Sequence, residues 1–178
     1  MNQAILNFAT RAHLYQLRKY TDDPYIIHPV AVADMVKDAG GDENMVNAAL
    51  LHDVLEDTSV THAELRAFLF QNFVAVDASD ILNLVVELTD VFTKEDFPDL
   101  NRKARKTLEA NRLGNVSDRA KQIKLMDIEH NSESIIEHDP KFAKVFLEEK
   151  KLLLLNIKPK RDDLAYNNHF ARVYNIPH

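Results

Sequence analysis

The stretch Ala48–Thr58, AALLHDVLEDT, decides how the rest of the chain is interpreted. A helix turns by about 100° per residue, which would place one imidazole and three carboxylates within about 140° of arc: those of His52, Asp53, Glu56 and Asp57. Carboxylates this close raise one another's pKa or require a compensating cation. Imidazole beside carboxylate suits a divalent transition metal, so the stretch favours a metal site. The alternative that it leaves open is an amphipathic helix whose charged face is only solvated.

Length and charge limit the partners that the chain can have. The 178 residues are enough for one domain with a substantial core, and no repeat or low-complexity linker divides them, so we expect a single domain over 1–178. The net charge is −6, and the basic residues are dispersed along the chain. This argues against a nucleic-acid polymer or an anionic membrane as the main partner. A small phosphorylated ligand, held by a few local cations, is still compatible with the sequence.

The absence of cysteine excludes several classes of site. Disulfide scaffolds, thiolate zinc sites and cysteine nucleophiles cannot occur in this chain. The N-terminal residues lack a basic region, and no run approaches the roughly 18 apolar residues that a membrane span needs. We therefore expect a soluble, cytoplasmic protein.

The spacing of apolar residues predicts an all-α fold. Helical periodicity together with capping signals predicts helices near 3–18, 29–39, 42–58, 61–70, 81–88, 101–114, 117–138 and 140–152, with a further one near 164–174. Asp42, Ser117 and Asp139 are the expected N-caps of three of these helices, and Thr61 with Glu64 forms an expected capping box. No segment alternates in the way that a strand requires, so a helical bundle is the predicted architecture.

Two polar pieces outside the opening stretch could reach the same cation. His28 precedes Pro29 at the start of a predicted helix. Asp127 lies within the long helix, on a stripe that spans about 80° and also contains Lys124, Asn131 and Ser134. An aspartate within a helix is often only solvated, but the polar stripe and the apolar residues that flank it favour a position facing a cleft.

The order of these pieces resembles the HD metal-dependent phosphohydrolase superfamily. Within it, the chain is similar to the hydrolase domain of the RelA/SpoT homologues and to the stand-alone small alarmone hydrolases. The stretches that match are PYIIHP at 24–29, AALLHDVLEDT at 48–58, LTD at 88–90, Arg102-Lys103, and IKLMD at 123–127 with Asn131. The resemblance covers about residues 4–135, and from 140 to 178 the sequence is only typical of helices. It implies a single-domain HD-type helical bundle.

The resemblance also implies a metal centre. Position by position, it assigns one Mn²⁺ ion to four ligands: His28, His52, Asp53 and Asp127. Two imidazoles and two carboxylates leave coordination positions open for water and a phosphate oxygen, as a hydrolase needs.

Glu56 and Asp57 correspond to a Glu-Asp pair that the family places beyond the metal ligands, and the resemblance implies a catalytic role for both residues. Glu56 lies one turn from His52 and could orient or deprotonate the attacking water. Acids near a helix C-terminus oppose the helix dipole, so this pair does not stabilise its own helix. The alternative is that the two acids lie on a terminal helical turn and are only solvated.

Substrate contacts are implied at five positions. Arg18 and Lys19 match the basic pair that the family uses for the base and phosphates of its nucleotide, and arginine suits both contacts through its planar cation and its fork of donors. Asn131 and Ser134 match positions on the ribose and phosphate side of the ligand. Lys124 could contact a phosphate or serve as a structural ion pair.

The implied reaction is the Mn²⁺-dependent hydrolysis of the 3′-pyrophosphate of (p)ppGpp, which yields GDP or GTP and pyrophosphate. Other expected possibilities are the same chemistry on (p)ppApp, the removal of the 2′-phosphate of NADPH, and a catalytically silent nucleotide sensor. The chain departs from the family pattern at Asp99, where some members have lysine, and at 128–134, where basic residues are replaced. These departures spare the four proposed ligands and reduce the positive charge expected around the substrate.

Overall fold

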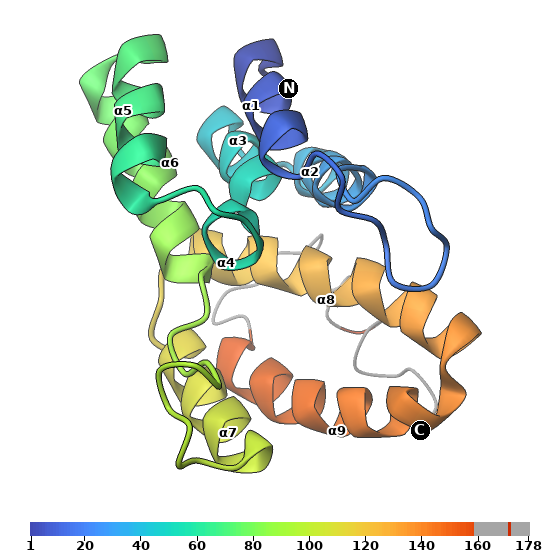
Figure 1. Cartoon of the computed structure of the whole chain (residues 1–178). Helices are drawn as coiled ribbons and strands as arrows, with labels where there is room; N and C mark the ends of the chain where they lie inside the picture. Colours follow the sequence, from blue (N-terminus) through green and yellow to red (C-terminus); the bar gives the residue numbers. More distant parts are fainter. Residues whose placement is uncertain (159–170, 172–178) are drawn as a thin grey trace. The chain divides into compact units, whose positions relative to one another are not determined.

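A computed structural model describes residues 1–158 and 171, and this part of the chain is α-helical (Figure 1). Its extended pairing is limited to one isolated bridge between Leu17 and Pro24. The predicted all-α class is therefore confirmed. The chain divides into two compact units, Met1–Thr89 and Asp90–His178, each with its own packed helices. The assignment of 1–178 to a single domain stays a prediction.

The first unit is built around one buried helix. Its elements are α1 (Gln3–Ala12), α2 (Ile27–Asp38), α3 (Glu43–Leu51), α4 (Val54–Asp57), α5 (His62–Asn72) and α6 (Ala75–Leu88). Helix α3 packs against α1, α2 and α6, and α5 packs against α6. Every residue of α3 from Met45 to Leu51 is buried, which explains why this segment is so rich in Ala and Leu.

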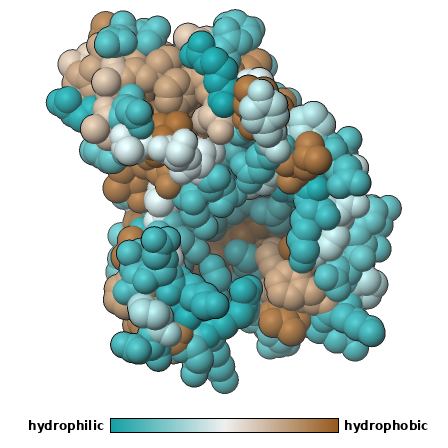
Figure 2. Space-filling model, in the orientation of Figure 1, coloured by the Kyte–Doolittle hydropathy of each residue, from teal (hydrophilic) through white to brown (hydrophobic). Residues whose placement is uncertain are grey.

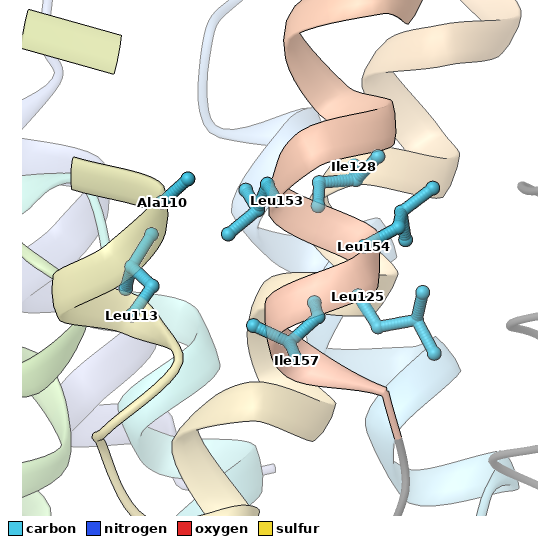
Figure 3. Close-up of a cluster of buried hydrophobic side chains, with 7 residues drawn as sticks. All are labelled: Ala110, Leu113, Leu125, Ile128, Leu153, Leu154 and Ile157. Atoms are coloured by element: carbon cyan, nitrogen blue, oxygen red, sulfur yellow. The ribbon is translucent and has the colours of Figure 1, made fainter. Parts of the chain in front are cut away.

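The second unit contains α7 (Arg102–Leu113), α8 (Asp118–His138) and α9 (Pro140–Ile157). Helix α9 packs against both α7 and α8. A cluster of buried aliphatic side chains joins the three helices (Figure 3), and its members are Ala110, Leu113, Leu125, Ile128, Leu153, Leu154 and Ile157. These helices are held together by burial of aliphatic surface.

The predicted helix caps are confirmed. The side chains of Asp42, Ser117 and Asp139 accept from the backbone N–H three residues ahead, at the starts of α3, α8 and α9. Thr61 and Glu64 form the expected reciprocal capping box of α5. Each signal is local, because it satisfies backbone donors within the same turn.

The first helix is shorter than predicted. It ends at Ala12 rather than near residue 18, and the chain continues through Tyr15, whose φ of 76° is left-handed. A continuous α-helix cannot contain that backbone conformation. The following loop turns back on itself, because Tyr25 N–H donates to Gln16 C=O at 2.9 Å.

The helix predicted over 42–58 is interrupted at its His-Asp pair. Helix α3 ends at Leu51, and the short helix α4 begins at Val54. His52 Nδ1 lies 2.7 Å from Ala49 C=O, the carbonyl that the Asp53 N–H would bond in a continuous helix. The ψ of Asp53 is −4°, well away from the value of an α-helix. The break changes the directions in which the polar side chains on either side of it point.

The helix predicted near 164–174 lies outside the described residues. Within 1–158 and 171, no helix combines the length and the apolar composition needed to cross a bilayer. Figure 2 shows a mostly hydrophilic face on which hydrophobic residues form separate patches. The predicted cytoplasmic location stays a prediction.

Gly41 fixes the turn between α2 and α3, where its N–H donates to Val36 C=O at 2.9 Å. A Cβ at this position would lie 2.6 Å from Val36 Cγ1 and 2.8 Å from Val36 C=O. We expect Gly41→Ala to lower the free energy of unfolding by about 2 kcal/mol, because the backbone must shift to admit the methyl group. Urea denaturation measures the change.

Gly40→Ala is the matched control. Its Cβ would meet nothing within 4 Å, although φ is +81°. We expect a loss of about 1 kcal/mol from the left-handed backbone alone. Equal losses in the two variants would mean that the close approach to Val36 costs nothing.

Candidate active site

Three predicted metal ligands meet in the first unit. His52 Nε2 lies 3.0 Å from Asp53 Oδ2, and His28 Nε2 lies 3.5 Å from the same oxygen. One ligand atom from each residue lies within 4.8 Å of the others, a spacing that could hold a metal ion. The two imidazole rings stand edge to face, with centroids 5.2 Å apart.

Local structure determines which atom each histidine presents. His28 is the second residue of α2 and is fully buried, while His52 caps the C-terminus of α3 and is 2 % exposed. The bond between His52 Nδ1 and Ala49 C=O requires the proton on Nδ1, so Nε2 keeps its lone pair on the side of Asp53. Two imidazole nitrogens and a carboxylate are a donor set that fits a divalent transition metal.

Tyr25 connects this trio to Asp57. Its hydroxyl lies 2.7 Å from Asp53 Oδ2 and 3.0 Å from Asp57 Oδ2. A phenol has one proton, so at any moment it donates to one of the two carboxylates. Burial, followed by the two nearby carboxylates, raises the pKa of the Tyr25 hydroxyl. Desolvation and the charge of Asp53 raise the pKa of Asp57.

Residues of the loop before α2 surround Tyr25. His13 Nδ1 lies 2.7 Å from Gln16 Oε1, and the ring of His13 is 4.8 Å from that of Tyr25. The guanidinium carbon of Arg18 lies 5.6 Å from the Tyr25 ring centroid, within cation–π range. The predicted substrate-binding residue Arg18 is thus close to the tyrosine that contacts Asp53.

The other predicted residues of the first unit are more exposed. Glu56 lies on α4 with its side chain exposed, four residues after His52 and beyond the break between α3 and α4. Lys19 is also exposed, and its Nζ lies 2.9 Å from the hydroxyl of Tyr20. Neither side chain is held in the core, so both can contact a molecule that binds from solvent.

The remaining predicted residues lie on α8, in the second unit. Asp127 is only 5 % exposed, so it is not a solvated surface aspartate. Its Oδ2 is 2.8 Å from Lys124 Nζ, and its Oδ1 accepts from Asn131 Nδ2 at 2.6 Å. Ser134, partly buried, follows on the next turn. The role of Asp127 as a fourth metal ligand stays a prediction.

Sequence reasoning missed a set of charged residues in the second unit. Lys106 Nζ lies 2.8 Å from Asp90 Oδ2. Burial opposes ionisation of Asp90, but Lys124 and Lys106 outweigh it, so the pKa of Asp90 lies below its usual value. Burial and the charge of Lys124 lower the pKa of Lys150 to about 8. No sequence signal groups these residues, because they come from different elements.

Sequence reasoning also gave no role to Tyr25, Gln16 or His13. Tyr25 is part of the PYIIHP stretch, which was used only to locate His28. Its contacts with Asp53 and Asp57 join residues 28 and 32 positions apart. Its place three residues before the predicted ligand His28 is the signal that could have drawn attention to it.

Comparison with known proteins identifies relatives of this chain. It is 37 % identical over 128 residues to the guanosine-3′,5′-bis(diphosphate) 3′-pyrophosphohydrolase MESH1 of Xenopus tropicalis, which covers 70 % of this chain and 64 % of the relative. The Homo sapiens MESH1 is 34 % identical with the same coverage. The chain thus spans less than two thirds of the length of these relatives.

A solved structure extends the likeness to the whole fold. It belongs to a metazoan ortholog of SpoT described as hydrolysing ppGpp, with a TM-score of 0.76, 25 % identity, and coverage of 97 % of this chain and 96 % of that chain. The resemblance to the RelA/SpoT hydrolases is confirmed. The sequence profile of the HD domain matches residues 6–151, which is most of the chain and continues into α9. The chain therefore belongs to the HD domain family.

Proposed function

We propose that this protein is a metal-dependent pyrophosphohydrolase that removes the 3′-pyrophosphate of the guanosine alarmone (p)ppGpp. The products are GDP or GTP and pyrophosphate. The observation that carries the proposal is the close group of His28, His52 and Asp53 in a chain similar to 3′-pyrophosphohydrolases over most of its length.

The proposed cofactor is one Mn²⁺ ion held by His28, His52 and Asp53, with Asp127 as the fourth ligand on the basis of the sequence resemblance. Mixed imidazole and carboxylate donors suit this class of ion. When bound, such an ion supplies Lewis-acid catalysis at a phosphoryl oxygen.

The proton and the nucleotide are assigned to other residues. Glu56 is proposed to orient the attacking water and accept its proton, since its carboxylate is exposed on the short helix that directly follows the His52-Asp53 pair. Asp57 is proposed to act beside Glu56, and it helps to hold the hydroxyl of Tyr25, which Asp53 also contacts. Arg18 and Lys19 are proposed to bind the nucleotide. On α8, Lys124, Asn131 and Ser134 are proposed to contact its ribose and phosphates.

A substrate panel tests the proposal directly. The purified chain is incubated with Mn²⁺ and ppGpp, ppApp or NADPH, and pyrophosphate and phosphate release are followed separately. We expect pyrophosphate from ppGpp at the highest kcat/KM. Faster turnover of ppApp would mean that the enzyme prefers an adenine nucleotide. Release of phosphate from NADPH would mean that it removes a 2′-phosphate. No turnover of any substrate, with nucleotide binding retained, would favour a silent sensor.

Tyr25→Phe should weaken metal binding without unfolding the protein. The change removes one hydroxyl whose bonds orient Asp53 and Asp57, and loss of such an outer contact typically lowers metal affinity about 10–100-fold. Calorimetric titration with Mn²⁺ measures the effect. Tyr15→Phe is the control, because Tyr15 is 92 % exposed. Equal affinities in the two variants would show that the hydroxyl does not position Asp53.

A further inference from the structure

We infer that Lys106, Lys124 and Lys150 form an anion site in the second unit that takes phosphate groups of the nucleotide. We call these three residues the lysine cluster. The identity of the nucleotide rests on the proposed function, whereas the binding of phosphate by the cluster does not. Lys106 and Lys150 carry no predicted role in the reaction.

The three lysines share one recess. They line it together with two acids and three aliphatic residues: Glu109, Glu149, Ala110, Leu113 and Leu153. These aliphatic residues belong to the buried cluster of α7, α8 and α9 in Figure 3, so part of the lining of the recess is apolar. A charge beside an apolar lining is less hydrated, and a bound anion would interact with it more strongly than on an open surface.

Both acids of the recess are already engaged by arginines. Glu149 accepts two hydrogen bonds from Arg102, at 2.6 and 2.8 Å. Glu109 pairs with Arg112 and also accepts from the N–H groups of Val91 and Phe92 at 3.1 Å. Neither carboxylate is therefore the main counter-ion of the lysine cluster.

Two aspartates pair with two of the lysines, and the third lysine is left over. Asp90 pairs with Lys106 and Asp127 pairs with Lys124, each at 2.8 Å. In the described part of the chain, Lys150 has no carboxylate within ion-pair distance, and its Nζ lies 5.1 Å from the ring centroid of Phe146. The group thus holds one more cation than anion.

The position of Lys150 is unfavourable to its own charge. Burial and the neighbouring Lys124 lower its pKa to about 8, although Asp127 and Asp90 act in the opposite direction. A methionine of similar length would occupy the same place without this cost. A lysine whose charge is disfavoured by burial and by the neighbouring Lys124, and which lines the same recess as two other lysines, is better explained by an anionic ligand than by the fold.

The recess itself has a volume of only about 20 Å³. A larger phosphorylated ligand would therefore lie mainly in the adjoining groove of about 600 Å³, which Lys106 and Glu149 also line together with Lys103 and Lys144. Binding sites for small molecules have volumes of about 300–1,000 Å³.

The test compares Lys150→Met with Lys141→Met. Lys141 lies on the same helix and is exposed, so its substitution removes the same charge away from the recess. Binding of inorganic pyrophosphate and of GDP is measured by calorimetry on the full chain in EDTA, and thermal unfolding is followed in parallel. We expect Lys150→Met to weaken the binding of both probes at least tenfold and to raise Tm by a few degrees. Lys141→Met should leave both probes' affinities unchanged.

The combination of readouts separates an anion site from a structural role. A structural lysine would lower Tm when replaced, and that result with unchanged pyrophosphate affinity would overturn the inference. Weaker binding of pyrophosphate in Lys150→Met supports it even if the chain cleaves no alarmone. The converse result is full turnover of ppGpp by Lys150→Met, with unchanged KM and unchanged binding of both probes. That result would overturn the anion site and leave the proposed function intact.

Discussion

Asp53→Ala is expected to abolish Mn²⁺ binding and to lower kcat/KM for ppGpp roughly a thousand-fold, since losing about 4 kcal/mol of transition-state stabilisation has this effect. Asp53 is the residue that both imidazoles face, with its Oδ2 at 3.0 and 3.5 Å from their Nε2 atoms. Without it, the grouped ligand atoms are reduced to two neutral nitrogens, and Asp127 is the one proposed carboxylate ligand that is left. A divalent cation is held poorly by so small a set of donors.

The same change should not damage the apo fold. Asp53 and Asp57 repel one another across Tyr25, which contributes to the raised pKa of Asp57, so removing one carboxylate relieves that repulsion. Ligand binding to the folded state raises Tm, and saturating Mn²⁺ should therefore stabilise the wild type but not the variant. Thermal unfolding with and without Mn²⁺ measures this directly.

Asp34→Ala is the matched control for Asp53→Ala. Asp34 is an exposed aspartate on α2, outside the proposed site, and its loss should leave both the Mn²⁺ response and the turnover at wild-type levels. If Asp53→Ala still shows a full Tm increase with Mn²⁺, the ion binds elsewhere, and the trio of His28, His52 and Asp53 is not the metal centre.

The elements that could be predicted from the sequence are those whose causes are local. The caps at Asp42, Thr61, Ser117 and Asp139 are correct because each satisfies backbone donors within three residues. The end of α1 was predicted wrongly for the opposite reason. Apolar periodicity continues past Ala12 to Leu17, and it cannot reveal that Tyr15 turns into the left-handed region.

The centre of the opening stretch shows the same limit. Hydrophobic periodicity runs without a break from Met45 to Leu55, so it predicts one helix. The interruption arises at His52, whose side chain bonds the Ala49 carbonyl. A side chain that competes for a backbone acceptor leaves no trace in the spacing of apolar residues.

Contacts between distant segments were the least predictable part of the site. The order of His28, His52 and Asp53 suggested their meeting through the family resemblance, and the structure does bring their ligand atoms together. The contact of Tyr25 with two aspartates depends on how the loop before α2 folds back. The lysine cluster depends on the packing of α7, α8 and α9, whose sequences carry no shared motif.

Glu56→Gln is expected to retain Mn²⁺ binding and to lower kcat. Glutamine has nearly the same shape as glutamate but cannot accept a proton at neutral pH, so the substitution removes only the proposed chemical role. Removal of a general base typically costs about 10²–10⁴-fold in rate, and we expect kcat for ppGpp to fall within this range. KM and the Mn²⁺ affinity should change little, because Glu56 is not among the grouped ligand atoms.

The interpretation of Glu56→Gln depends on three measurements made on the same protein: kcat, KM and Mn²⁺ affinity. Glu43→Gln supplies the control, since Glu43 is an exposed acid at the start of α3, outside the proposed site. A loss of kcat together with a loss of Mn²⁺ affinity would make Glu56 a ligand rather than a base. Full kcat in Glu56→Gln would exclude it from proton transfer and leave Asp57, already linked through Tyr25 to Asp53, as the remaining acid of the pair.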